Sequence, residues 1–302
     1  MSRRDCLLAA LVASIWGFNF IVIDWGMAGV PPLLFLTFRF LLVVVPTIFF
    51  LPRPDAPWRT IVATGALLSL GHFGFLYLSL DAGLTPGLAA LVIQAQVIFT
   101  VVIATVALHE RPSRTQVVGV GIGSLGLVVV GLGRGGDVPV VAVGLCLLGA
   151  LSWGLGNVVS RASGVRAGLS LTVWSSLVVP VPSFVLALAV HGPSAVADGL
   201  AAFGWKAALS TIYTAGLASI VGWGIFHTLL SRNAPAAVVP WVLLAPVVAM
   251  LSAAVLLSQT PNTAETIGGA AMVAGVLVAL RAPVARADSA PGMAEALARR
   301  SA

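Results

Sequence analysis

The sequence contains very few charged residues for its length. Asp, Glu, Lys and Arg make up 9% of its 302 residues, whereas hydrophobic residues make up 59%. A soluble globular domain carries about 25% charged residues, which it needs for a hydrated surface. Apolar runs of about 18 residues or more, long enough to cross a bilayer, recur along the chain. The shortage of charge therefore argues against a soluble protein with a large core and indicates a surface that faces lipid.

Lysine and cysteine are also scarce. One of the 16 basic residues is Lys, and nearly all of them lie in short hydrophilic breaks. The net charge of +6 is therefore a signal of membrane topology, and we expect no nucleic-acid partner. The two cysteines, Cys6 and Cys146, make no disulfide framework, and the sequence has no cysteine cluster that would hold a metal.

Enzyme signatures are missing as well. The sequence has no Walker A loop, no His-Glu-x-x-His motif and no Gly-x-Ser-x-Gly motif. We therefore expect no catalytic residue and no cofactor. The missing ATP-binding loop also argues against transport driven by ATP hydrolysis in this chain alone. An intramembrane enzyme that uses His72 or His227 as a base remains an alternative.

The alternation of apolar and polar residues that a transmembrane β-barrel requires is absent too. The runs are apolar on every side, so they predict helices, the other structure that satisfies its own backbone in lipid. Breaks rich in Pro, Gly and charged residues divide the chain into ten segments. The expected transmembrane helices span about 6–27, 32–51, 58–80, 85–107, 114–133, 138–160, 168–190, 204–230, 235–257 and 264–281.

The two halves of the chain resemble each other. Trp16-Gly17 in the first segment is matched by Trp153-Gly154 in the sixth, and Ala95-Gln96-Val97 in the fourth is matched by Ala245-Pro246-Val247 in the ninth. Because five helices per half is an odd number, the halves enter the membrane in opposite senses, as in many secondary transporters. We therefore predict an all-α polytopic membrane protein in which two inverted five-helix repeats surround a central cavity.

The distribution of basic residues predicts the orientation. If the N-terminus is cytoplasmic, thirteen basic residues lie in the inside breaks, and only Arg134 and Lys206 lie in the outside breaks. This is a strong positive-inside bias, so we expect both termini in the cytoplasm of a bacterium and the helices in its inner membrane. The predicted repeats are residues 1–137 and 138–281, with a cytoplasmic tail at 282–302.

Acidic residues are missing from the middle of every segment. A cavity for a strongly cationic substrate, or a central carboxylate proton switch, would need one. The sequence therefore predicts a neutral, aromatic and amide-lined cavity that suits amphipathic or zwitterionic small molecules. For the tryptophans the alternative is packing, and for an intramembrane histidine it is a hydrogen bond to a carbonyl. The residues that we expect to bind substrate are Trp16, Asn19, His72, Tyr77, Gln96, Trp153, Asn157, Trp223 and His227.

Three further residues are predicted to have gating or structural roles. Asp24 and Arg39 lie toward the outer ends of the first two segments, where we expect an ion pair rather than a substrate clamp. Pro246 is expected to free a backbone carbonyl and to kink the ninth segment. Gly119-x-x-x-Gly123 and Gly268-Gly269 predict close packing between helices of one chain, so we expect a monomer or a weak dimer.

In their order and double occurrence, these motifs resemble those of the drug/metabolite transporter superfamily, specifically its ten-helix EamA-type members. The resemblance covers about residues 6–281. Its motifs are Trp16-Gly17, Trp153-Gly154, Phe38-Arg39-Phe40, Leu108-His109-Glu110-Arg111-Pro112, Gln116-x-x-Gly119 and Ala245-Pro246-Val247. The family implies a five-plus-five inverted repeat, a central cavity, alternating access and export of metabolites from the bacterial cytoplasm. Its amino-acid exporters, those for aromatic amino acids included, fit the predicted cavity best.

The sequence departs from the family at three points. Gln96 stands where the family usually has proline, and Thr260 occupies the position that matches Glu110. The first-helix glutamate that small multidrug members use for proton coupling has no counterpart, so facilitated efflux is an expectation beside proton coupling.

We therefore predict an inner-membrane transporter that exports amino acids or similar small amphipathic metabolites by alternating access. Its expected partners are a small-molecule substrate and the lipid bilayer. The alternative substrate is a phosphorylated sugar or a nucleotide sugar, for which Arg39 is the one basic residue within a span.

Overall fold

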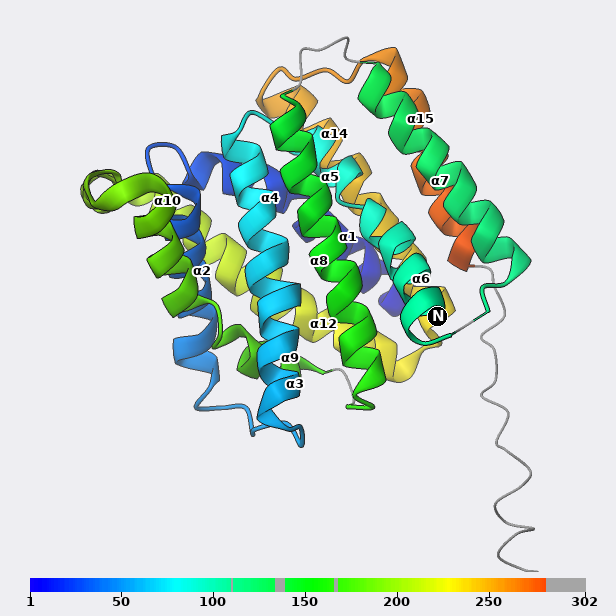
Figure 1. Cartoon of the computed structure of the whole chain (residues 1–302), viewed down its shortest axis with the longest axis horizontal. Helices are drawn as coiled ribbons and strands as arrows, with labels where there is room; N and C mark the ends of the chain where they lie inside the picture. Colours follow the sequence, from blue (N-terminus) through cyan, green and yellow to red (C-terminus); the bar gives the residue numbers. More distant parts are fainter. Residues whose placement is uncertain (110, 134–138, 166–167, 281–302) are drawn as a thin grey trace, which may run out of the picture.

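The computed structural model describes residues 1–109, 111–133, 139–165 and 168–280, and within these ranges the regular structure is helical (Figure 1). Glu110 and the predicted tail at 282–302 lie outside the described residues. Up to residue 133 the elements are α1 (Arg3–Gly26), α2 (Pro32–Thr47), α3 (Trp58–Thr64), η1 (Gly65–Gly71), α4 (His72–Asp81), α5 (Pro86–Val92), α6 (Ala95–Ala107) and α7 (Arg114–Leu132). From residue 139 they are α8 (Val140–Ala162), α9 (Leu169–Ser176), α10 (Pro180–Ala201), α11 (Trp205–Ile212), η2 (Tyr213–Val221), α12 (Gly222–Arg232), α13 (Pro235–Val238), η3 (Val239–Leu243), α14 (Leu244–Leu256) and α15 (Thr263–Leu280).

The helices have the length and composition of membrane spans. Over the described residues, seven are long and apolar enough to cross a bilayer: Arg3–Gly26, Trp58–Asp81, Pro86–Ala107, Val140–Ala162, Pro180–Ala201, Trp205–Arg232 and Val239–Leu256. Three shorter apolar helices are Pro32–Thr47, Arg114–Val130 and Thr263–Ala279. Each of the ten predicted segments thus contains an apolar helix, and the chain is an all-helical polytopic membrane protein.

The seventh predicted segment, 168–190, differs most from the structure. α9 ends at Ser176, and α10 continues well beyond residue 190, with a kink at Gly192, whose φ is 84°. Glycine adopts this left-handed conformation at little cost, and the following Pro193 cannot donate a helical hydrogen bond. The hydrophilic break that ended the predicted segment is therefore a bend within a longer helix.

The helices pack in a symmetrical pattern. α7 and α15 lie side by side along one edge of the molecule, and α2 and α10 lie against each other at the opposite edge (Figure 1). Between the two edges, α1 packs against α14 and α8 packs against α6. α1 also contacts the stretch α11–η2–α12, while α8 contacts the stretch α3–η1–α4. α1 and α8 therefore occupy equivalent central positions.

Glycines bring α7 and α15 close together. A Cβ atom built on Gly126 would lie 2.5 Å from the carbonyl oxygen of Gly268, and one built on Gly119 would lie 2.5 Å from the backbone nitrogen of Ala279. Backbones approach this closely only where small residues face each other. Gly119 and Gly268 therefore pack between helices of the same chain, as the sequence predicts.

Four stretches near the centre of the bundle depart from regular α-helix. η1 and η2 are π-helices, a rare form that occurs mostly as single turns and frequently at functional sites. The path from α5 to α6 is interrupted at Ile93 and Gln94, where the backbone makes tighter i→i+3 hydrogen bonds. The path from α13 to α14 is interrupted by η3, a 3₁₀-helix, and Pro246 lies in the first turn of α14.

The largest hydrophobic core lies toward the ends of the helices that are remote from the N-terminus. It joins the end of α1, the beginning of α2, the end of α4, the beginning of α5 and the beginning of α8, with Phe35 and Tyr77 fully buried at its centre. This core closes the bundle on the side remote from the N-terminus. Space for a cavity is therefore left between the middle of the helices and their opposite ends.

Candidate functional site

A central cavity of about 550 Å³ lies between the helices. Residues of α1, α2, α3, η1, α4, α6, α7, α8, α9, η2, α12, η3 and α15 line it. The lining continues to helix ends on the side of the N-terminus, where Arg111, Arg161 and Leu169 belong to it. A volume of about 300–1,000 Å³ is typical of pockets for small molecules. The cavity is therefore large enough for a metabolite and extends to one end of the bundle.

One side of the cavity is an aromatic wall made of Trp16, Trp153, Trp223, Phe226 and His227. The ring centroids of Trp16 and Trp223 are 4.9 Å apart, and those of Trp153 and Trp223 are 5.9 Å apart in a stacked arrangement. His227 stacks on Trp223 with a centroid distance of 5.7 Å. Such clustered rings form a rigid apolar surface at low entropic cost.

A hydrogen bond fixes the indole of Trp16. Its Nε1 donates to the backbone carbonyl of Ala218 at 2.9 Å, within the π-helix η2. A π-helix leaves backbone groups that regular α-helical bonds do not satisfy, so a side-chain donor stabilises it. The aromatic wall and the irregular helix therefore support each other.

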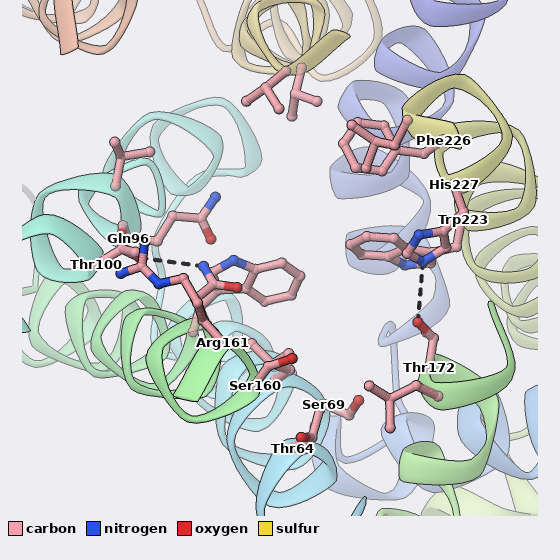
Figure 2. A pocket seen from close by; sticks show the side chains of 18 of the residues that line it. Thr64, Ser69, Gln96, Thr100, Ser160, Arg161, Thr172, Trp223, Phe226 and His227 are labelled. Carbon is pink, nitrogen blue, oxygen red and sulfur yellow. Dashed lines mark hydrogen bonds between the residues drawn. The ribbon is translucent and has the colours of Figure 1, made fainter. Parts of the chain in front are cut away.

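A polar wall made of Gln94, Gln96, Thr100 and Asn157 also lines the cavity and adjoins the aromatic wall on α8, where Asn157 follows Trp153 by about one turn. Gln96 Nε2 donates to Gln94 Oε1 at 3.4 Å, and Asn157 Nδ2 donates to Thr100 Oγ1 at 3.3 Å. Figure 2 shows Gln96 and Thr100 facing Trp223, Phe226 and His227 across the open space. The cavity thus has one apolar side and one side of neutral amides and hydroxyls.

The polar wall coincides with the interruption between α5 and α6. Gln94 and Gln96 flank it, and Val242 and Leu243 of η3 bring the second interruption to the same cavity. Backbone that is not helical is tolerated at membrane depth where it lines a cavity or is buried in protein. Interrupted helices that meet at a central site are characteristic of secondary transporters.

Hydroxyl groups also line the cavity. Thr64 and Ser69 of the third span and Ser219 of η2 belong to its lining, and Figure 2 shows Thr64 and Ser69 side by side. Thr172 on α9 makes a hydrogen bond to His227 Nε2 at 3.4 Å. Sequence reasoning missed these residues, because hydroxyl side chains occur along many helices and carry no distinguishing pattern.

Six of the nine predicted substrate-binding residues line the cavity: Trp16, Gln96, Trp153, Asn157, Trp223 and His227. The other three lie deeper. His72 is buried, with Nδ1 at 3.1 Å from the carbonyl oxygen of Gly149 and its ring 4.5 Å from that of Trp153. This is the structural alternative for an intramembrane histidine, and it supports the wall from behind.

Tyr77 and Asn19 are also buried outside the lining. Tyr77 is fully buried, and its hydroxyl accepts a hydrogen bond from Arg39. Asn19 is 6% exposed, and its Oδ1 has no hydrogen-bond partner among the described residues.

Asp24 and Arg39 do not form the expected ion pair in the described part of the chain. The guanidinium of Arg39 donates from Nη1 to Tyr77 Oη at 2.7 Å and from Nη2 to Ser219 Oγ at 3.1 Å. α2 packs chiefly against α10, α4 and η2, and α1 packs against α14 and the eighth span. Although the first two helices are neighbours in sequence, they do not bring these two side chains together.

The described lining contains no Asp or Glu, and no group of three or more His, Cys, Asp or Glu that could hold a metal occurs in the described residues. Pro246 is buried at the contact of α14 with α1, where a Cβ atom built on Gly17 would lie 2.5 Å from the carbonyl oxygen of Ala245. The basic side chains of the lining, Arg111 and Arg161, belong to its N-terminal end.

The comparisons with known proteins agree with this architecture. The model of the EamA-like transporter family matches the chain twice, over residues 4–132 and over residues 140–281. The chain is 37% identical over 284 residues to a protein of Salmonella typhimurium (strain LT2) named "Probable amino-acid metabolite efflux pump", covering 92% of this chain and 95% of that protein. It is 36% identical to a protein of the same name from Escherichia coli (strain K12), with the same coverage of both chains.

A solved structure described as "Crystal structure of protein" has the same fold, with a TM-score of 0.61 and 21% identity, covering 100% of this chain and 99% of that chain. This likeness concerns the fold alone. The family has a ten-helix membrane fold and its members are transporters rather than enzymes. The chain belongs to the EamA-like transporter family.

Proposed function

We propose that this transporter exports amino acids or similar small amphipathic metabolites from the cytoplasm by alternating access. The observation that carries the proposal is the pairing of an aromatic wall with a neutral polar wall across a cavity of about 550 Å³. An apolar side chain would pack on Trp223 and its neighbours, and the polar end of the same molecule would meet the amides of Gln94, Gln96 and Asn157. The printed names of the Salmonella and Escherichia coli relatives point to the same substrate class.

The proposed topology consists of two inverted repeats, residues 1–137 and 138–281. The double match to one family model supports it, as does the equivalent packing of α1 and α8. The positive-inside bias favours cytoplasmic termini in a bacterial inner membrane. In that orientation the cavity extends to the cytoplasmic side, and the largest hydrophobic core closes the other side. The structure would then represent an inward-facing state.

Alternating access requires the closed side to open while the open side closes. We propose that η1 and η2 are the points at which the third and eighth spans bend. π-helices are rare and occur frequently at functional sites, and here they lie at matching positions of the two spans. Since the described lining has no carboxylate, the proposed mechanism is facilitated efflux down the metabolite gradient.

The alternative of a phosphorylated sugar receives less support. A phosphate carries about two negative charges, and Arg39, the basic side chain behind the middle of the cavity, would balance one of them. Arg111 and Arg161 lie at the end of the cavity lining.

Counterflow tests the proposal directly. Liposomes that hold purified protein are loaded with unlabelled L-leucine and placed in radiolabelled L-leucine at equal pH on both sides. We expect transient uptake of label without a proton gradient and competition by apolar and aromatic amino acids. Folded wild-type protein that exchanges none of these amino acids would refute the substrate class.

The variant Trp223→Ala tests whether the aromatic wall contacts the substrate. If Trp223 covers about 50 Å² of apolar substrate surface, its loss lowers affinity by about 1.2 kcal/mol, or roughly tenfold. The matched control is Trp205→Ala, because Trp205 is 70% exposed and lies outside the cavity. The control variant should exchange L-leucine as the wild type does.

A further inference from the structure

Arg39 is a buried arginine on α2 at the centre of the membrane span. It is 2% exposed, and its guanidinium carbon lies 4.1 Å from the ring centroid of Phe73. Nη1 donates to Tyr77 and Nη2 donates to Ser219, both of them neutral hydroxyl groups. A charge held by hydroxyls and an aromatic face is less stabilised than one held by a carboxylate.

The counter-ion of Arg39 is missing from the described part of the chain. No described Asp or Glu makes an ion pair with it, and Nε has no hydrogen-bond partner among the described residues. An arginine inside a membrane span normally pairs with a carboxylate, lines a wet cavity or binds a substrate. The side chain therefore has capacity for an anion that the chain does not supply.

The guanidinium lies directly behind the cavity. Phe73, on which it stacks, and Ser219, to which it donates, both line the cavity. Only one layer of side chains therefore separates the unpaired charge from the space in which a substrate would bind. The Ser219 hydroxyl also donates to the carbonyl of Thr214, within η2.

We propose that Arg39 is the receptor for the carboxylate of the transported molecule. This inference rests on the proposed function, because it assigns the charged end of an amino acid to one residue. Nε and Nη2 point the same way from one edge of the guanidinium, and together they offer the two parallel donors that a carboxylate binds. Nε has no partner to lose, and Nη2 exchanges the neutral Ser219 hydroxyl for a carboxylate oxygen.

The position of this receptor also links binding to movement. The bond from Arg39 to Ser219 joins α2 to the eighth span at the closed side of the cavity. A carboxylate that takes over Nη2 releases Ser219, so that η2 is free to move away from α2. Molecules without a carboxylate would leave this bond in place.

The test compares L-leucine with L-leucinol, which has a hydroxymethyl group in place of the carboxylate. Binding of each to purified protein is measured by quenching of tryptophan fluorescence, since three tryptophans line the cavity. We expect wild-type protein to bind leucine at least roughly tenfold more tightly than leucinol, as a charge-assisted bidentate pair implies. In Arg39→Gln this preference should disappear while the affinity for leucinol stays within about threefold of the wild type.

Two further variants keep the result interpretable. Arg59→Gln removes an exposed arginine outside the cavity and should keep the wild-type preference. Arg39→Lys keeps the charge but loses the two parallel N–H donors of the planar guanidinium, so the preference for leucine over leucinol should fall. This variant provides the test if Arg39→Gln does not fold. Folded Arg39 variants that keep the full preference, or that lose leucine and leucinol binding equally, would overturn the receptor assignment.

The two proposals fail in different ways. Wild-type protein that binds leucine and leucinol equally overturns the assignment of Arg39 and leaves amino-acid export in place. Wild-type protein that binds and exchanges no amino acid overturns the proposed function, and the receptor assignment with it.

Discussion

Substitution of Gly126 by alanine is the most direct test of the seam between α7 and α15. A Cβ atom at this position would lie 2.5 Å from the carbonyl oxygen of Gly268 and 2.8 Å from the backbone nitrogen of Met272. Both atoms belong to the backbone of α15, so a rotamer change cannot relieve the overlap. The two helices would have to separate, and the neighbouring contacts along the seam would be lost.

The same helix provides a matched control. A Cβ atom at Gly121 would meet no described atom within 4 Å, so Gly121→Ala adds a methyl group without a clash. Both substitutions gain the same helix propensity, about 1 kcal/mol for glycine to alanine. The difference between the two variants therefore reports the cost of overpacking, about 1–3 kcal/mol.

Thermal unfolding of the purified protein in detergent measures this difference. At about 2–4 °C per kcal/mol, we expect Gly126→Ala to unfold about 2–12 °C below Gly121→Ala. Gly126 and its contacts Gly268 and Met272 are not part of the cavity lining, so folded Gly126→Ala should still exchange L-leucine at low temperature. Equal unfolding temperatures of the two variants, or a higher one for Gly126→Ala, would refute the close approach of these helices.

Three other substitutions probe the cavity. Trp16→Phe keeps an aromatic ring but leaves the carbonyl of Ala218 without its donor, so we expect a loss of about 1 kcal/mol, seen as a lower unfolding temperature. Thr64→Val replaces a buried hydroxyl by a methyl group of similar size, and this hydroxyl has no hydrogen-bond partner among the described residues. The unfolding temperature should therefore stay equal or rise, and a clear fall would show that the hydroxyl does have a partner. Gln96→Pro removes the side-chain amide and also the backbone hydrogen bond from Gln96 N to the carbonyl of Ile93, so we expect a lower unfolding temperature and weaker binding of L-leucine. Unchanged binding by the folded variant would remove Gln96 from the polar wall.

The number of membrane spans and their helical structure could be predicted, because they depend on hydropathy summed over the many residues of each span. Each predicted segment contains an apolar helix, and the family match and the all-helical fold confirm the class. The end of the seventh segment was predicted less accurately. A Gly-Pro pair such as Gly192-Pro193 can either end a helix or bend it, and the sequence alone does not distinguish the two. Beyond the bend, α10 still packs against α2, where Gly199 lies against Pro31.

The rotation of each helix was harder to predict, and this explains why three candidate residues lie outside the cavity. In a soluble helix a polar face marks the solvent side, but here the lipid side and the core side are both apolar. Trp16 lines the cavity, whereas Asn19, one turn later on α1, does not. For His72 and Tyr77 the π-helix η1 adds a further error to the predicted direction of the side chains. Each extra residue in a turn rotates the side chains that follow by about 100° around the helix axis.

The internal repeat explains why the two halves contribute matching residues to the cavity. Differences between the repeats explain why the cavity is asymmetric. Ser69 and Ser219 occupy matching positions of the third and eighth spans, and both line the cavity. The offset that relates Trp16 to Trp153 also relates Arg39 to Ser176, so the one arginine that is buried among the described residues has an uncharged counterpart. A symmetrical cavity would bind a substrate in two opposite senses with equal affinity. A single charge at the closed side removes this degeneracy, so that an amino acid would bind with its carboxylate toward Arg39 and its side chain on the aromatic wall.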